Sequence, residues 1–567
     1  MKKKWWHEKI GYQIYPKSFL DTNGDGVGDL TGVIEKLPYL EQLGVDILWL
    51  SPVYPSPMVD NGYDISDYEN IDPRFGTLED MDRLIAEAKK KNISIIMDLV
   101  VNHCSDQHAW FQKAIADPKG PYGDYFYLKE GKDGKEPNNW RSYFGGSVWE
   151  KLPGQDNLYY YHAYAKQQPD LNWENPALRE EIYKMVNWWL DRGIAGFRID
   201  AIINIKKDLT WEDLPVDGPD GRGFLTNSIT RMQKRDGGTK NGIGVFLREL
   251  KERCFAPHDA FTVGEVFEVD REQLEEFIGE DGYFSTMFAF DPIQSYKKGT
   301  CQCEFDRNMN PDEWKQDVFV NQKLLGDIAF EANIIENHDM ARGATIYIPD
   351  EDYGFASISA LAGLQVLQRG MPFLYQGQEI GMTNCPFELE DIDDIMTLDN
   401  YRYAVACGFP EEKAFAGCAR ESRDNARTPM QWSDAENADF TTGKPWLKVN
   451  PNYPEINVAR QEKEYGSVLN FYRRLLCFRK SEEYRDLLTY GTFEPMYEDQ
   501  ERIFAFKRTL GKQCLTVICN ESSAERFLTL KEDYEEVVFV NLPQVTRIGD
   551  NLILHPYQLI VVETTKK

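Results

Sequence analysis

The chain of 567 residues lacks long apolar runs, Cys-x-x-Cys pairs and an excess of positive charge. No apolar stretch approaches the roughly 20 residues that a membrane-spanning helix needs, which argues against an integral membrane protein. None of the ten cysteines stands in a Cys-x-x-Cys pair, so a disulfide scaffold is not indicated. The basic start of the chain is not followed by the apolar segment of a secretory signal. We therefore expect a cytoplasmic protein.

The charge balance is strongly acidic, with 64 Lys and Arg against 93 Asp and Glu and a formal net charge of −29. Such a surface repels phosphate backbones and anionic lipids, so we expect neither nucleic acid nor a membrane as a partner. A small neutral substrate is compatible with it. Aromatic residues make up 13% of the chain, and most of them are expected in a large core, while some can form flat platforms for a sugar ring. The sequence leaves the oligomeric state open, with a monomer as the simpler expectation.

Short apolar runs alternate with helical stretches over most of the chain. Eight such runs lie at residues 10–15, 45–50, 93–101, 196–200, 261–265, 285–290, 333–335 and 372–375. Continuous apolar strands separated by helices indicate a parallel sheet that is buried on both faces. Eight of these units predict an α/β fold of the (β/α)8 TIM barrel type.

The alternation is interrupted in two places. A stretch rich in Gly, Pro, Asn and Tyr follows the third strand, and such a long excursion is usually functional or a small domain of its own. Near the end of the chain, strands and turns alternate without helices, which indicates an antiparallel β domain. We therefore predict a catalytic barrel at residues 1–103 and 174–488, an inserted loop-rich subdomain at 104–173, and a C-terminal β-sandwich at 489–567.

Polar residues follow four of the predicted strands, at the edge where barrel enzymes have their active sites. In chain order these are Asp98, Asn102, His103, Arg198, Asp200, Glu265, Asn337, His338 and Asp339. A single carboxylate after a strand is usually a helix cap, but three carboxylates with two His and an Arg at matching ends indicate catalysis. They suit glycoside cleavage, in which one carboxylate attacks the anomeric carbon and a protonated one serves the departing oxygen. Because Arg198 lies on the same side of its strand as Asp200, we expect it to lower the pKa of Asp200.

The phrases DLVVNH, GFRID, VGE and ENHD, together with QPDLNW at 168–173, resemble the motifs of the alpha-amylase superfamily of glycoside hydrolases. The resemblance implies that Asp200 is the nucleophile, Glu265 the general acid and base, and Asp339 the stabiliser of the transition state. It implies a retaining mechanism through a covalent glucosyl-enzyme. It also implies that the subsite for the sugar is lined by His103, Gln168, Arg198 and His338.

A closer resemblance is to the oligo-1,6-glucosidase branch, through YQIYPKSF, DNGYDISDY and SRDNARTPMQW. It implies an exo-acting alpha-glucosidase whose pocket is closed at the non-reducing end of the substrate. Asp60 and Arg427 would hold the hydroxyls of the terminal sugar, and Tyr63 would stack on its ring. Arg423 remains an alternative partner for Asp60, and the other arginine is then expected in a structural ion pair.

Ala201 follows the expected nucleophile, where Val in this branch tends to accompany alpha-1,6 cleavage. We expect isomaltose and isomalto-oligosaccharides as substrates. Alpha-1,4 (maltase-like), sucrose-cleaving and trehalose-6-phosphate-cleaving activities, and sucrose isomerisation, stay open as alternatives. An inactive sugar-binding relative is disfavoured because all three carboxylates are present.

The segment DTNGDGVGD at 21–29 places carboxylate and amide oxygens at alternate positions between glycines, like the start of a calcium loop. No Glu closes the loop as an EF-hand requires. The resemblance to the branch implies a structural Ca²⁺ or Mg²⁺ ion bound by Asp21, Asn23, Asp25, the carbonyl of Val27, and Asp29. The alternative is an Asx-turn loop without metal. No catalytic cofactor is expected.

Overall fold

The computed structural model describes residues 2–225, 242–267, 271–294, 296–297, 304 and 307–564. Its centre is a parallel sheet with the strand order β11-β10-β8-β3-β2-β1-β13-β12. A parallel bridge between Phe288 and Ala332 joins the two edges of this order and closes the barrel. The eight-stranded barrel that the sequence predicts is therefore confirmed. Its strands are β1 (Gly11–Ile14), β2 (Ile47–Leu50), β3 (Ser94–Val100), β8 (Gly196–Asp200), β10 (Phe261–Gly264), β11 (Thr286–Met287), β12 (Ala332–Asn333) and β13 (Met371–Tyr375).

Helices surround the barrel, and α4 (Pro176–Arg192) shows how the sequence specifies one. Its start is capped by the Asn175 side chain, which accepts the Ala177 N–H at 2.9 Å, and Gly193 ends it with a φ of 111°. The other barrel helices are α1 (Leu30–Leu43), α2 (Leu78–Lys90), α6 (Ile243–Leu250), α7 (Arg271–Ile278), α8 (Asp291–Gln294), α9 (Pro311–Leu325), α10 (Gly343–Tyr347), α11 (Phe355–Leu367), α12 (Ile395–Ala406), α13 (Glu411–Arg420), α14 (Asp424–Arg427), α15 (Val458–Gln461), α16 (Val468–Arg479) and α17 (Arg485–Tyr490).

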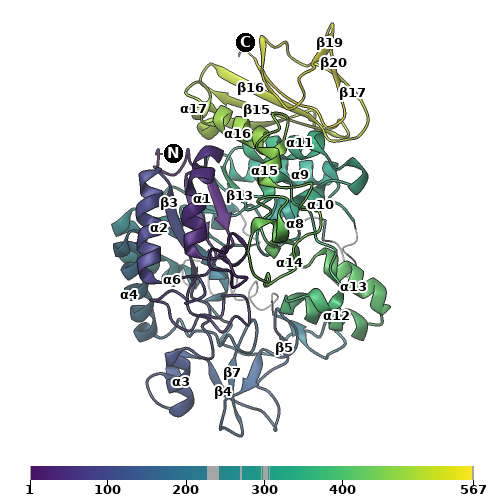
Figure 1. Cartoon of the computed structure of the whole chain (residues 1–567). Helices are drawn as coiled ribbons and strands as arrows, with labels where there is room; N and C mark the ends of the chain where they lie inside the picture. Colours follow the sequence, from purple (N-terminus) through teal and green to yellow (C-terminus); the bar gives the residue numbers. More distant parts are fainter. Residues whose placement is uncertain are drawn as a thin grey trace.

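The segment after β3 forms a small unit with its own aromatic core. Figure 1 shows it at the end of the molecule opposite the C-terminal strands. Trp140, Trp149 and Tyr161 are buried there, together with Trp211 from the segment after β8. Its elements are α3 (Ala109–Ala116), the antiparallel strands β4 (Leu128–Glu130), β7 (Leu158–Tyr161) and β6 (Trp149–Lys151), and β5 (Trp140–Arg141), which pairs with β9 (Gly223–Phe224).

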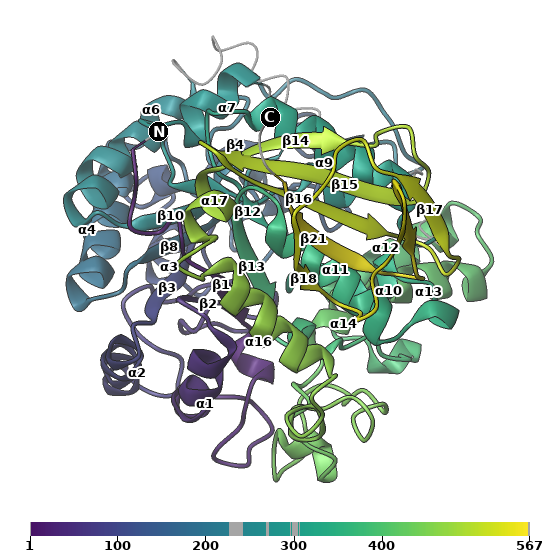
Figure 2. The same cartoon turned by 90° about the horizontal axis from the view of Figure 1, so that it is seen from above.

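The C-terminal part consists of two antiparallel sheets, and its larger sheet lies over α11 and α16 (Figure 2). Arg508 connects it to the barrel by donating from Nη1 to the carbonyl of Leu367 at 2.9 Å. The larger sheet has the order β14 (Thr492–Met496), β15 (Ile503–Leu510), β16 (Gln513–Asn520), β21 (Leu559–Glu563) and β18 (Glu536–Val540), and the smaller has β17 (Arg526–Thr529), β20 (Asn551–Leu554) and β19 (Thr546–Ile548). The domain limits given above stay predictions. Within the described ranges, no helix has both the length and the apolar character to cross a bilayer.

Candidate active site

The buried guanidinium of Arg198 on β8 organises the carboxyl ends of three neighbouring strands. Its Nη1 lies 2.9 Å from Asp98 of β3 and 2.6 Å from Asp200 at the end of β8. Its Nη2 lies 3.1 Å from Oε2 of Glu265, directly after β10. The register of the sheet places Asp98 opposite Arg198, so that the pairing of β3, β8 and β10 brings these side chains together. Glu265 also accepts the backbone N–H of Ala201 at 2.8 Å.

Three carboxylates around one guanidinium leave this cluster short of positive charge. Burial raises the pKa of Asp200 well above its usual range, and the nearby carboxylates add to this effect while Arg198 opposes it. The expectation that Arg198 would lower the pKa of Asp200 is therefore wrong in its net direction. Burial also raises the pKa of Asp98 to about 6, against the effect of Arg198. The cluster of carboxyl groups as a whole consequently favours retention of a proton.

Asp339 lies across from this cluster, five residues after the last position of β12. It contacts His338 Nε2 at 3.0 Å, and Oδ1 lies 3.0 Å from Arg427 and 3.2 Å from Arg423. Burial opposes its ionisation, but His338 and the two guanidinium groups outweigh burial and hold the pKa of Asp339 well below its usual range. Asp339 is therefore a fixed negative charge at neutral pH.

His338 is held as a neutral ring by its surroundings. Burial lowers its pKa to about 4. Gln13 Nε2 lies 2.7 Å from Nδ1, which therefore accepts this bond and leaves the proton on Nε2, where Asp339 and the Tyr63 hydroxyl are close. Tyr63 in turn donates to Oδ2 of Asp98 at 2.9 Å. The ring of Tyr63 stacks on His338 with centroids 5.3 Å apart, so these two rings position each other.

A second cluster lies around Asp60. Its Oδ1 lies 3.1 Å from Nη2 of Arg423, and its Oδ2 accepts from Nε2 of Gln168 at 3.1 Å. Nε2 of Gln168 is also 3.1 Å from Nε2 of His103. Burial raises the pKa of Asp60 to about 6, while Arg423 acts in the opposite direction. Asp394, at the start of α12, holds Arg423 from the other side at 2.6 Å.

The partner of Asp60 is thus Arg423, where the resemblance favoured Arg427. Arg427 instead contacts Asp339 and donates from Nε to the carbonyl of His338 at 3.0 Å. The two arginines stand one helical turn apart at the two ends of α14, so both reach toward the barrel axis. Arg423 alone bridges Asp60 and Asp339, which assigns it the position that we had expected for Arg427.

The exposed fractions of the side chains show which acidic groups a substrate can touch. Asp98, Arg198, His338 and Arg427 have no exposed side-chain area. Asp200, Glu265 and Asp339 keep 11%, 15% and 29% of theirs. The structure therefore surrounds three partly accessible carboxylates with buried partners that hold them in place.

Several aromatic residues of the site were not predicted from the sequence. Phe144 lies under Arg423, at 5.3 Å from the guanidinium carbon, and the ring of Tyr164 is 5.2 Å from that of His103. Both come from the inserted segment, where many aromatics are alike in sequence. Phe267 stacks on Phe290 with centroids 4.6 Å apart. Its position two residues after Glu265, on the same side of an extended chain, is the signal that could have identified it.

The loop at 21–29 uses its side-chain oxygens for its own backbone. Asp21 accepts N–H groups of Asn23, Gly24 and Gly26 at 2.8–2.9 Å. Asn23 and Asp25 each accept the N–H two residues later, and Asp29 caps α1 through the Gly32 N–H at 2.7 Å. Across the described ranges, no group of three or more His, Cys, Asp or Glu side chains is arranged to hold a metal ion. The oxygen chemistry suits a hard cation, but the observed geometry is that of Asx turns.

Comparison with known proteins gives concordant results. Residues 13–491 match the family model described as alpha amylase, catalytic domain. The oligo-1,6-glucosidase of Halalkalibacterium halodurans is 42% identical over 525 residues, which cover 92% of this chain and 91% of that protein. The trehalose-6-phosphate hydrolase of Bacillus subtilis is 37% identical over 582 residues, covering 99% and 98%. The crystal structure of isomaltulose synthase from Klebsiella sp. LX3 superposes with a TM-score of 0.90 at 36% identity, covering 99% and 100%. The chain belongs to the alpha-amylase family of glycoside hydrolases.

Proposed function

We propose that this chain is a retaining, exo-acting alpha-glucosidase that releases glucose from the non-reducing end of short alpha-glucosides. One observation carries the proposal. Three partly accessible carboxyl groups lie at one end of the barrel, namely those of Asp200, Glu265 and Asp339. Arg198 forms ion pairs with Asp200 and Glu265, while Arg423 and Arg427 form ion pairs with Asp339. That arrangement supplies two carboxyl groups for glycoside chemistry and a third negative charge beside them.

In this proposal the proton that the carboxyl cluster retains is carried by Glu265 when the substrate reacts, so that Asp200 is ionised. Asp200 attacks the anomeric carbon, Glu265 gives its proton to the glycosidic oxygen, and the bond between the anomeric carbon and that oxygen breaks. The glucosyl ester on Asp200 is then cleaved by water, whose proton returns to Glu265. Asp339 stays ionised throughout and stabilises the positive charge that develops on the sugar ring. Arg198 keeps the two reacting carboxyl groups within reach of one carbon.

The cluster around Asp60 supports removal of single units from chain ends. Asp60 accepts hydrogen bonds from both Gln168 and Arg423, and Arg423 is anchored to Asp394. Their remaining donors and acceptors suit the hydroxyls of one terminal sugar. A closed end of this kind excludes a chain that continues past it.

We propose isomaltose and isomalto-oligosaccharides as substrates, in line with the relative named oligo-1,6-glucosidase. Hydrolysis of alpha-1,4 links, sucrose or trehalose 6-phosphate, and isomerisation of sucrose, are alternatives. Ala201 keeps them open, because its side chain ends at Cβ and its backbone N–H is what contacts Glu265. The similarity to isomaltulose synthase over the whole chain makes sucrose the second substrate to test.

The decisive experiment compares the unmodified chain with Asp200→Asn and Glu265→Gln on aryl alpha-glucosides of graded leaving-group pKa. Asp200→Asn should lose turnover on all of them. Glu265→Gln should lose most on poor leaving groups, because a good leaving group needs no proton. The exposed Asp191→Asn on α4 is a matched control that should behave like the unmodified chain. Unchanged turnover in Asp200→Asn, or an equal loss across all leaving groups in Glu265→Gln, would reject the assignments.

A side-by-side rate comparison on isomaltose, maltose, sucrose and trehalose 6-phosphate then decides the substrate. Proton NMR of the first product formed distinguishes retention, which releases the alpha anomer of glucose, from inversion. Isomaltose as a poor substrate relative to maltose or sucrose would overturn the alpha-1,6 proposal while leaving the reaction class intact.

We also propose a structural Ca²⁺ or Mg²⁺ ion for the loop at 21–29, with Asp21, Asn23, Asp25, Val27 and Asp29 as oxygen donors. The support is the oxygen chemistry of these donors and their spacing in the sequence. Side-chain oxygens of Asp21, Asn23 and Asp25 accept backbone N–H groups in the structure, so an ion would share or replace these bonds. Its role would be to brace the loop that leads into α1.

A further inference from the structure

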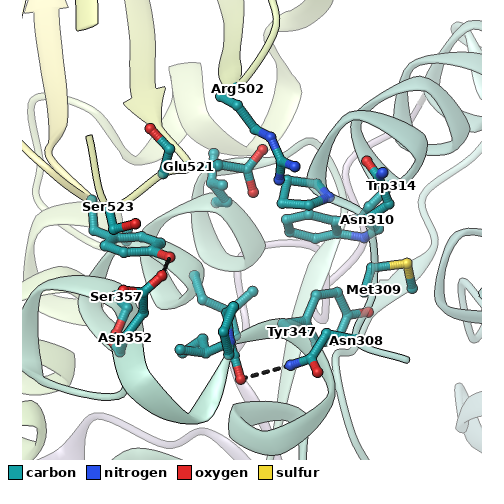
Figure 3. Close-up of a pocket in the computed structure, with 18 of the residues that line it drawn as sticks. Asn308, Met309, Asn310, Trp314, Tyr347, Asp352, Ser357, Arg502, Glu521 and Ser523 are labelled. Atoms are coloured by element: carbon teal, nitrogen blue, oxygen red, sulfur yellow. Dashed lines mark hydrogen bonds between the residues drawn. The ribbon is translucent and has the colours of Figure 1, made fainter. Parts of the chain in front are cut away.

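A cavity of about 540 Å³ lies between the barrel and the C-terminal sheets, apart from the carboxylate site. None of the residues assigned to the active site lines it. Figure 3 shows Trp314, Tyr347 and Asp352 on the barrel side, with Arg502, Glu521 and Ser523 contributed by the C-terminal part. Its volume is within the range of small-molecule sites.

The barrel side of the cavity is largely apolar and aromatic. Trp314 of α9 meets Tyr347 of α10 edge to face, with ring centroids 5.0 Å apart. Leu361 and Leu364 of α11 continue this surface. Such a floor suits the apolar C–H faces of a pyranose ring.

The opposite side carries an acid and a base that are little used by the protein. Within the described ranges, the Glu521 side chain has no hydrogen bond or ion pair of its own, and burial raises the pKa of its carboxyl group well above its usual range, against the effect of Lys315 and Arg502. Arg526 has no carboxylate partner, and its Nε is 3.3 Å from the hydroxyl of Ser522. Arg502 reaches Asp312 only at 3.5 Å. Polar groups in such a position remain available for a ligand.

The two turns that bring these groups to the cavity have an unusual backbone. Arg502 and Tyr557 have φ values of 61° and 52°, in the left-handed region that non-glycine residues rarely adopt. The Tyr557 hydroxyl donates to Asp352 at 2.7 Å and fixes its turn to the barrel. Strained residues of this kind are concentrated at sites that hold ligands.

We propose that this cavity is a second carbohydrate site, which binds a short neutral oligosaccharide without cleaving it. Sugar hydroxyls both donate and accept, so one ligand can satisfy the Glu521 carboxyl group and the Arg526 guanidinium together. A phosphate or carboxylate ligand would meet the negative charge of Asp352. The proposal is independent of the catalytic assignments.

Isothermal titration of the Asp200→Asn chain with isomaltotriose tests the proposal, because that background is expected to bind without turnover. Two binding events are expected, one in the catalytic pocket and one in the cavity. Glu521→Gln should weaken the second event at least about tenfold, and Ser523→Trp, which fills the cavity from an exposed position, should abolish it. Glu525→Gln and Arg547→Ala, which do not line the cavity, are matched controls.

A single binding event, or a second event that survives both cavity variants, would overturn the proposal. Displacement of isomaltotriose from the second site by inorganic phosphate would show an anion site instead and would also overturn it. In the otherwise unmodified chain, Glu521→Gln and Ser523→Trp should keep full turnover of a chromogenic alpha-glucoside, which verifies their fold. If the unmodified chain also fails to turn over the chromogenic alpha-glucoside, while Asp200→Asn shows the second binding event and the two cavity variants weaken or lose it, the proposed function fails and this inference stands.

Discussion

The closed end of the pocket gives a pH-dependent prediction, because Asp60 has a pKa of about 6. Above this pH it is ionised and pairs with Arg423 at 3.1 Å. Below it the carboxyl is neutral, and the bonds that it shares with Arg423, Gln168 and a sugar hydroxyl weaken. The Asn side chain of Asp60→Asn has nearly the shape of a protonated Asp. At every pH the variant therefore lacks the negative charge that Asp60 of the unmodified chain loses only in acid.

The size of the effect follows from these contacts. A hydrogen bond to a charged group is worth about 1.5–3 kcal/mol, so Asp60→Asn should lower kcat/KM about tenfold to a hundredfold at pH 7.5. At pH 5, one unit below the pKa, about nine tenths of the unmodified molecules carry a neutral Asp60. The ratio of kcat/KM between the two proteins should therefore fall about tenfold between pH 7.5 and pH 5.

The assay is kcat/KM on a chromogenic alpha-glucoside across this pH range for both proteins. Ionisations elsewhere in the site, such as that of Asp200, affect both proteins alike and cancel in the ratio. Asp67→Asn, an exposed carboxylate of the same segment, is the control and should give a ratio near one throughout. A ratio for Asp60→Asn that stays constant across pH 6 would refute the reasoning.

Three further predictions concern stability. Burial raises the pKa of Glu331 from 4.5 to about 8. Unfolding at neutral pH therefore releases its proton, and the free energy of unfolding falls as pH rises from about 4.5 to 8. Glu331→Gln should remove this fall, so that the free energy of unfolding measured in urea is higher by up to about 4 kcal/mol at pH 8 and unchanged at pH 4.5. Arg508→Met should lower the free energy of unfolding by about 2–4 kcal/mol, because the carbonyls of Leu367, Thr492 and Gly491 lose a buried donor; an unchanged urea midpoint would contradict this. Chelation with EDTA should lower the melting temperature if the loop at 21–29 binds a cation, and Asp21→Asn should abolish that response. A melting temperature that does not change with EDTA would reject the cation and support an Asx-turn loop without metal.

The barrel could be predicted because the sequence signal is local. An apolar strand, a capped helix and a polar strand end recur in order, and α4 with Asn175, Pro176 and Gly193 has both its ends marked in the sequence. The acidic residues at strand ends could be placed for the same reason, since the carboxyl ends of parallel strands in a barrel all face one side.

What could not be predicted depends on contacts between distant segments. Arg423 and Arg427 stand one turn apart, and only the position of the loop that carries Asp60 decides which of them forms the ion pair. The net pKa of Asp200 depends first on its burial and then on how many carboxylates lie near Arg198, and no spacing in the sequence reveals either. Phe144 and Tyr164 belong to a segment whose aromatics all look alike until the chain folds over the barrel mouth.

The closed end at Asp60 and Arg423 also imposes an order of events on the proposed reaction. A terminal sugar held at Asp60 and Arg423 leaves the severed portion of the substrate on the other side of the anomeric carbon, and this portion must depart before water or another sugar can approach the glucosyl ester from that side. Water or a second sugar then has to enter the space that the leaving group has vacated. The choice between hydrolysis and transfer is therefore made in that vacated space, and substitutions of the residues that border it are the ones expected to change the product.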